Sequence, residues 1–166
     1  GPIFVYDNTS ALKITDWGFD GWGDDTAFTK DNAVPAGVAA ATGIPRVDIG
    51  GTVIEGGSME VDGGVFMATR SSILESARNP GLTQAALQPI LTANLGVTKF
   101  IWLDGAPGGG DDITDTHIDG FAKFGPERTL VTLSATDLTY WGISAADQAV
   151  LANATDIASV AYTRVE

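Results

Sequence analysis

The chain has 166 residues, of which 44% are hydrophobic, and this length and composition are typical of one globular domain with a sizeable buried core. Its formal net charge of -12, with nine Lys and Arg residues, disfavours nucleic acid and anionic membrane surfaces as partners and favours a cationic ligand. The absence of cysteine excludes disulfides, thiolate metal sites and a thiol nucleophile within these 166 residues.

Three segments are predicted to form hairpins, because each joins two short runs of β-branched and aromatic residues through a turn-forming sequence. The strands of the second and third hairpins are expected at residues 52–55, 65–69, 117–124 and 129–133, with residues 59–61 extended, and the three turns at 7–10, 62–64 and 125–128. A segment of helical character follows each hairpin, and strands at 46–49 and 99–103 follow the first two of these helices.

Each predicted helix has recognisable start or stop signals. The expected N-caps are Asp31 or Asn32, Thr83 and Ser144, and the expected stops are Gly43 and Gly96. Pro89 lies inside the second helix, where an interior proline costs about 3 kcal/mol. We therefore expect this helix to kink or to begin late.

The chain is predicted to be an α/β domain built from a repeated strand–strand–helix–strand unit, with a period of roughly 55 to 60 residues. The units cover approximately residues 1–50, 51–104 and 111–166, and the third is expected to stop after its helix. No linker rich in Pro, Ser or charge separates them, which favours one domain over residues 1–166. Such units bury their faces against neighbours, so a chain that opens directly on a strand is expected to be a fragment of a larger ring.

The stretch "GDDITDTHIDGF" contains the only histidine of the sequence. If residues 117–121 form a strand, His117 and Asp119 project from the same face. An imidazole beside a carboxylate suits proton transfer, and the carboxylate can also bind a cationic substrate. A purely structural hydrogen bond between the two side chains remains the alternative.

The aspartates around this histidine raise the question of a metal site. The four are Asp111, Asp112, Asp115 and Asp119. A calcium loop is disfavoured because Ile113 and Thr116 break its ligand spacing, and zinc is disfavoured because one histidine and no cysteine are present. We expect no metal.

Glu55 ends an apolar run and is followed by Gly56 and Gly57. The two glycines permit either a close backbone approach or a turn with positive φ, and the turn is the favoured interpretation. Glu55 and His117 occupy comparable places in successive repeats, so both could face one shared centre. Carboxylates that converge on a cleft suit a guanidinium, whose planar N–H donors pair with two oxygens.

Aromatic residues in "WGFDGWG" have two possible roles. Trp17, Phe19 and Trp22 either provide walls for a bound cation or serve as core and rim residues at the end of a hairpin. The sequence leaves both roles open.

Five stretches, in order along the chain, together resemble the agmatine deiminase and bacterial-type peptidylarginine deiminase family of the pentein, or guanidine-modifying, superfamily. They are "GPIFV…DWGFDGWG", "IEGGSMEVDGG", "ARNPGLT", "LGVTKFIWL" and "DDITDTHIDGF". The resemblance implies an incomplete pentein α/β propeller, with about three strand–strand–helix–strand units of an expected five around a central active site. The "NP" after an arginine, with "EGG" upstream, favours the agmatine branch.

In that family a cysteine thiolate attacks the guanidinium carbon, ammonia leaves, and water hydrolyses the thiouronium intermediate. Carried over by motif, the resemblance implies that His117 is the general acid/base, that Asp119 grips the guanidinium, and that Glu55 helps to position the substrate. It implies an agmatine deiminase, which converts agmatine and water to N-carbamoylputrescine and ammonia in putrescine biosynthesis. The implied substrate is a small cationic guanidine, and no cofactor is expected.

This sequence also departs from the family pattern. The nucleophilic cysteine and the first guanidinium-binding aspartate of the family would lie outside these residues, so the isolated chain is expected to be inactive. Glu60 stands where many relatives have histidine, and Thr116 stands where glycine is usual before the histidine. The alternatives are a peptidylarginine deiminase, a non-catalytic pentein-like binding module, and a fragment that does not fold stably.

No apolar run approaches the roughly twenty residues that a membrane span requires, and no basic-then-apolar leader opens the chain. We therefore expect no membrane segment. A cytoplasmic location is expected on the same grounds.

Overall fold

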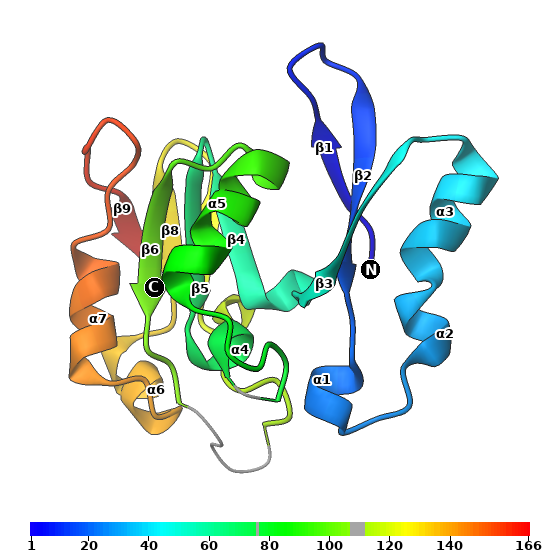
Figure 1. Cartoon of the computed structure of the whole chain (residues 1–166). Coiled ribbons are helices and arrows are strands. Elements are labelled where there is room, and N and C mark those ends of the chain that lie inside the picture. The colour runs from blue at the N-terminus through cyan, green and yellow to red at the C-terminus, as the bar shows by residue number, and fades with distance from the viewer. Residues whose placement is uncertain (76, 107–111) are drawn as a thin grey trace. The chain divides into compact units, whose positions relative to one another are not determined.

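The computed structural model describes residues 1–75, 77–106 and 112–166. Over these residues, three three-stranded sheets follow one another along the chain (Figure 1). In each sheet the first two strands form an antiparallel hairpin, and the third strand, which follows helical structure, pairs in parallel with the second. The predicted strand–strand–helix–strand repeat is therefore confirmed.

The chain divides into two compact units. One consists of Gly1–Gly56 and Ser76–Gly81, and the other of Gly57–Glu75 and Leu82–Glu166. The first unit holds one sheet and the second holds two. The expectation of one domain over residues 1–166 stays a prediction.

The first sheet consists of β1 (Ile3–Tyr6), β2 (Leu12–Gly18) and β3 (Arg46–Val53). The hairpin turn lies where the sequence predicts it, because the Asp7 carboxylate accepts the backbone N–H groups of Thr9 and Ala11. The separate strands expected at 46–49 and 52–55 were wrong, since β3 runs continuously through two glycines. Glu55 therefore lies beyond the strand, not at its end.

Helical structure connects β2 to β3 in this unit. It comprises α1 (Gly21–Asp24), α2 (Thr29–Asn32) and α3 (Val34–Thr42). Pro35 occupies the first turn of α3, and Gly43 ends it in the left-handed conformation with a φ of 71°. The predicted cap was wrong: Ala33 holds that position, and the Asn32 side chain instead accepts the N–H of Phe19.

The second unit contains the other two sheets. They consist of β4 (Met59–Asp62), β5 (Val65–Thr69) and β6 (Lys99–Leu103), and of β7 (Ala122–Gly125), β8 (Thr129–Thr132) and β9 (Thr163–Val165). The expectation that the third repeat stops after its helix was wrong, because β9 pairs in parallel with β8 and places Val165 beside Val131. A three-residue strand is too short for a period-2 pattern to reveal it in the sequence.

The helical elements of the second unit include two that the sequence predicts, α5 and α7, and the others were not predicted. They are η1 (Gly56–Ser58), α4 (Ser71–Leu74), α5 (Gln84–Leu95), η2 (Ile118–Gly120), α6 (Ala135–Tyr140) and α7 (Ala145–Ala152). Thr83 and Ser144 cap α5 and α7 as predicted, and Gly96 ends α5. Helix α5 does not begin late despite Pro89, because its cap fixes the start at Gln84. No helix in the described ranges is both long and apolar enough to cross a bilayer.

One hydrophobic core joins the two sheets of the second unit. Its buried members are Val65, Met67, Ile101, Leu103, Ile118, Phe121, Ala122, Leu130, Leu138, Ile143, Leu151, Ala154 and Tyr162. Strands β5 and β6 contribute from one sheet, and β7, β8, η2, α6 and α7 contribute from the other repeat. The short η2 turn is therefore anchored in the same core as the sheets.

Tyr162 provides a polar tie across this core. Its hydroxyl donates a hydrogen bond of 2.9 Å to the Asp62 carboxylate at the end of β4. Burial, together with this bond and the Asp62 charge, raises the pKa of Tyr162 well above its ordinary value.

Replacing Tyr162 with phenylalanine is expected to lower the free energy of unfolding by about 1–2 kcal/mol, because the Asp62 carboxylate loses a donor. The raised pKa also predicts a pH dependence: above about pH 10 the unfolded tyrosine ionises while the folded one stays neutral, so stability falls as pH rises. Urea unfolding at pH 7 and pH 10.5 measures both effects. The variant should lose less stability than the wild type between these pH values, and an equal loss would refute the assignment.

Candidate functional site

His117 and Asp119 flank Ile118 at the η2 turn. The strand expected at residues 117–121 was wrong, because these residues form a 3-10 turn and β7 begins only at Ala122. Ile118 is fully buried in the core, and η2 packs against β4, β5 and β7. The anchored Ile118 leaves His117 half-buried and Asp119 exposed on either side of it.

The side chains of His117 and Asp119 nevertheless lie close together, beside Gly57. A Cβ atom on Gly57 would lie 2.7 Å from His117 Nδ1, 2.7 Å from Asp119 Oδ2 and 2.9 Å from Asp119 Oδ1. No side chain fits there without moving these groups. Neither Gly56 nor Gly57 has a positive φ, so the favoured interpretation of a glycine turn was wrong. Gly57 instead lies close to the His117 and Asp119 side chains, and close approach of its backbone to a ligand stays a prediction.

The loop before His117 is organised by Asp112. Its carboxylate accepts hydrogen bonds from the backbone N–H and hydroxyl of Thr114 and from the N–H of Thr116. Burial opposes ionisation of Asp112, but these bonds and the nearby His117 outweigh it and hold the pKa of Asp112 below its ordinary value. Asp112 is therefore an anionic part of the loop at neutral pH.

The question of a metal site can be addressed only for part of the aspartate cluster, since Asp111 lies outside the described residues. Within the described ranges, no group of three or more His, Cys, Asp or Glu side chains is arranged to hold a metal ion. The expectation that no metal binds stays a prediction.

Glu55 lies in the first unit, where it is buried with an arginine. Its Oε1 accepts a 2.8 Å hydrogen bond from Nε of Arg78, and the Arg78 side chain has no exposed surface. The next residue, Asn79, accepts the N–H of Val53 with Oδ1 and donates to the Val53 carbonyl through Nδ2. Arg78 and Asn79 therefore fix the segment that ends at Glu55.

Sequence reasoning missed this pair of supporting residues. The signal was present, because a glutamate in an apolar run calls for a cationic partner, and "ARNPGLT" supplies an arginine. The sequence does not say which of its nine basic residues fills the role. The joining of Glu55 with His117 and Asp119 in one site stays a prediction.

The aromatic residues of "WGFDGWG" separate into two groups. Trp17 is only 3% exposed in β2, and its indole N–H donates to the Thr15 hydroxyl, so it is a core residue. Phe19 and Trp22 are half-buried and pack edge to face, with ring centroids 5.1 Å apart. Their possible role as walls for a cation stays open.

Glu60, which departs from the family pattern, ties the two sheets of the second unit. Its carboxylate accepts the N–H of Phe124 at 3.3 Å and lies 3.2 Å from the Lys123 ammonium. The residue therefore links β4 to β7. Both of these contacts stabilise the pairing of the two sheets.

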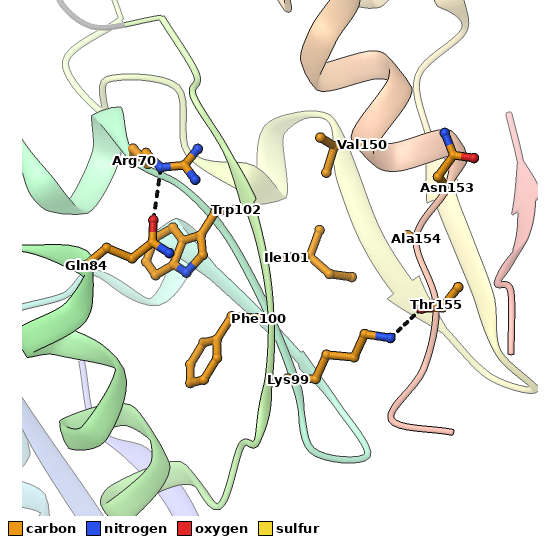
Figure 2. Close-up of a pocket in the computed structure, with 10 residues that line it drawn as sticks. All are labelled: Arg70, Gln84, Lys99, Phe100, Ile101, Trp102, Val150, Asn153, Ala154 and Thr155. Atoms are coloured by element: carbon orange, nitrogen blue, oxygen red, sulfur yellow. Dashed lines mark hydrogen bonds between the residues drawn. The ribbon is translucent and has the colours of Figure 1, made fainter. Parts of the chain in front are cut away.

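An open hollow of about 440 Å³ lies along β6, apart from these groups (Figure 2). Figure 2 shows Arg70 hydrogen-bonded to Gln84 on one side of the strand and Lys99 bonded to Thr155 on the other. Arg70 also pairs with Asp104. Both cations of the hollow already have protein acceptors, and none of the site residues predicted from the sequence lines it.

The turn at His117 can therefore combine two kinds of chemistry. An imidazole can accept and donate a proton, and a carboxylate such as that of Asp119 can accept two N–H donors of a planar cation. The polar atoms of both groups lie where a side chain on Gly57 would stand. This arrangement suits a small, positively charged substrate that exchanges protons during its reaction.

Comparisons with known proteins bear on the same region. A family model described as Porphyromonas-type peptidyl-arginine deiminase matches residues 1–166. The chain is 35% identical to the agmatine deiminase of Pseudomonas fluorescens over 130 residues, which are 75% of this chain and 35% of that protein. It is 34% identical to the agmatine deiminase of Stutzerimonas stutzeri over 165 residues, which are 94% of this chain and 44% of that protein.

A solved structure of the C. jejuni agmatine deiminase with substrate bound is similar to this chain, with a TM-score of 0.78 and 26% sequence identity. The likeness covers 100% of this chain and 48% of that one. The chain thus spans less than half the length of these relatives. This likeness and the three repeats of the chain together confirm the predicted fold, an incomplete pentein α/β propeller.

Proposed function

Because the chain belongs to the Porphyromonas-type peptidyl-arginine deiminase family, we propose that the protein carrying it is a hydrolase that deiminates agmatine. The products would be N-carbamoylputrescine and ammonia. The observation that carries the proposal is the convergence of His117 and Asp119 on the bare backbone of Gly57. The names of the agmatine deiminases that this chain is similar to support agmatine as the substrate.

Each residue has a distinct role in this proposal. Asp119 pairs with the guanidinium N–H groups and holds the carbon in position for attack. A cysteine outside these residues supplies the thiolate that attacks this carbon, since the chain itself has none. His117 returns a proton to the departing ammonia and then takes one from the water that releases the carbamoyl product.

Glu55 contributes a second carboxylate to the substrate site in this proposal. Its ion pair with Arg78 fixes its position, although both groups are buried. A carboxylate whose position is fixed in advance binds a guanidinium without further ordering cost.

A peptidylarginine deiminase is the second candidate, and the description of the matching family favours it. The same two residues at η2 would serve it, because the guanidinium is the same in both substrates. The two activities differ in whether the cleft admits a peptide. A binding module that holds a cation without turnover is the third candidate.

The test is to incubate the protein that carries this chain with agmatine and, separately, with an arginine-containing peptide, and to measure ammonia and the carbamoyl product. Agmatine turnover that exceeds peptide turnover supports the proposal, and the reverse supports the second candidate. Binding without turnover of either would favour the module. The 166-residue chain alone should release no ammonia, and turnover by it would refute the need for an external thiol.

A small guanidine is the proposed ligand. A cytoplasmic location and the absence of nucleic-acid and membrane partners stay predictions.

A further inference from the structure

Thr116, the residue before His117, has an unusual backbone. Its φ is +68°, and that of Asp115 is +54°. A β-branched residue in the left-handed region is a conformational outlier, because its side chain crowds the backbone there. Such strain persists only where the surroundings hold the residue in place, and it is concentrated at functional sites.

Every polar atom of Thr116 is engaged. Its hydroxyl accepts the N–H of Ala106 and donates to the Ala106 carbonyl, both at 3.2 Å. Its own N–H donates to Asp112, and its carbonyl accepts a 2.8 Å hydrogen bond from the Thr69 hydroxyl. One residue thus connects three separate parts of the second unit.

The partners of Thr116 are themselves fixed. Thr69 ends β5 and is fully buried. The segment that leads to Ala106 is held at Asp104 and Gly105, whose N–H groups donate to the two carboxylate oxygens of the buried Asp147 in α7. The Ser71 hydroxyl donates a hydrogen bond to the carbonyl of Asp115, as the Thr69 hydroxyl does to the carbonyl of Thr116. The strained backbone is therefore held from β5, α4 and α7.

We infer that Thr116 is a positioning residue. Its hydroxyl binds the backbone N–H and carbonyl of Ala106, a contact that we call the Thr116 clasp, and this contact fixes the orientation of His117 relative to Asp119 and Gly57. The inference rests on the proposed function only for its catalytic consequence. On one side of His117 the buried Ile118 fixes the chain, and on the other side the Thr116 clasp does. An imidazole held from both sides meets its substrate in one orientation, and a displacement of 1 Å can cost about a hundredfold in rate.

Two variants of the protein that carries this chain test the role of the hydroxyl. Thr116→Ser keeps the hydroxyl, and Thr116→Val keeps the branched shape without it. We expect Thr116→Ser to retain kcat within about threefold. Thr116→Val should lower kcat at least about tenfold, with KM within about threefold, because orientation and not binding is lost.

A second readout does not depend on turnover. Histidine labelled with ¹³C at Cε1 gives one NMR signal per imidazole, and the signal of His117 is identified by its loss in His117→Gln. Thr116→Val should shift or broaden this signal, and Thr116→Ser should leave it near the wild-type position.

The outcomes distinguish the two proposals. Identical His117 signals in the wild type, Thr116→Ser and Thr116→Val would overturn the positioning role, whatever the activity. A serine variant as impaired as the valine variant would also overturn it, because the hydroxyl would then be irrelevant. A wild-type protein that deiminates neither substrate would remove the proposed function, while the shifted valine signal would still support the clasp.

Discussion

Replacing His117 with alanine in the protein that carries this chain is expected to lower kcat for agmatine by about 10²- to 10⁴-fold, the usual contribution of a general acid or base. The cause is local. The imidazole is the proposed proton donor and acceptor at η2, and Ile118 would still anchor the turn in the core. The KM should change little, because Asp119 would still hold the guanidinium.

The matched control is Asp119→Asn, which keeps the shape of the side chain and removes its charge. It should reduce kcat/KM partly through a raised KM, since a neutral amide pairs poorly with a guanidinium. Steady-state kinetics on agmatine separates the two patterns. A His117→Ala enzyme with a kcat within tenfold of the wild type would remove the histidine from the proposed chemistry.

Replacing Arg78 with methionine is expected to lower the free energy of unfolding of the chain by about 3–5 kcal/mol, the usual cost of removing one partner from a buried ion pair. Glu55 is only 6% exposed, so water cannot take over from the guanidinium. Methionine fills similar space without a charge. Urea unfolding followed by tryptophan fluorescence measures the change, because the buried Trp17 lies in the same unit.

Two companion variants make this prediction specific. Adding Glu55→Gln to Arg78→Met should recover part of the loss, because the buried charge that faced Arg78 is then removed. Lys13→Met, which breaks the exposed Lys13–Asp7 pair of the same unit, should cost much less. A similar small loss for Arg78→Met would mean that the buried pair does not hold the segment at Glu55.

The features that the sequence predicted correctly are those with local causes. The turn at Asp7, the caps Thr83 and Ser144, and the stop at Gly96 each depend on side chains or glycines within a few residues of the backbone they shape. The repeat follows from the recurrence of these local signals. Its third unit was read as too short because β9 owes its existence to pairing with β8.

The features that were missed depend on tertiary packing. A period-2 pattern at residues 117–121 indicates a strand, but burial of Ile118 between β4, β5 and β7 imposes a 3-10 turn instead. The prediction placed His117 and Asp119 on one face of a strand. In the structure their side chains lie together beside Gly57. Arg78 finds Glu55 from 23 residues away, which no local pattern encodes.

Gly57 offers the most direct test of the claim that His117 and Asp119 form one working site, because its φ is compatible with alanine and the three atoms nearest to an added Cβ belong to these two residues. The measurement is kcat/KM for agmatine in Gly57→Ala beside Gly56→Ala, where a Cβ meets nothing within 4 Å. We predict a loss of at least about a hundredfold for Gly57→Ala, since its methyl group displaces both side chains, and near-normal activity for Gly56→Ala. Equal, near-normal activity of the two variants would contradict the account.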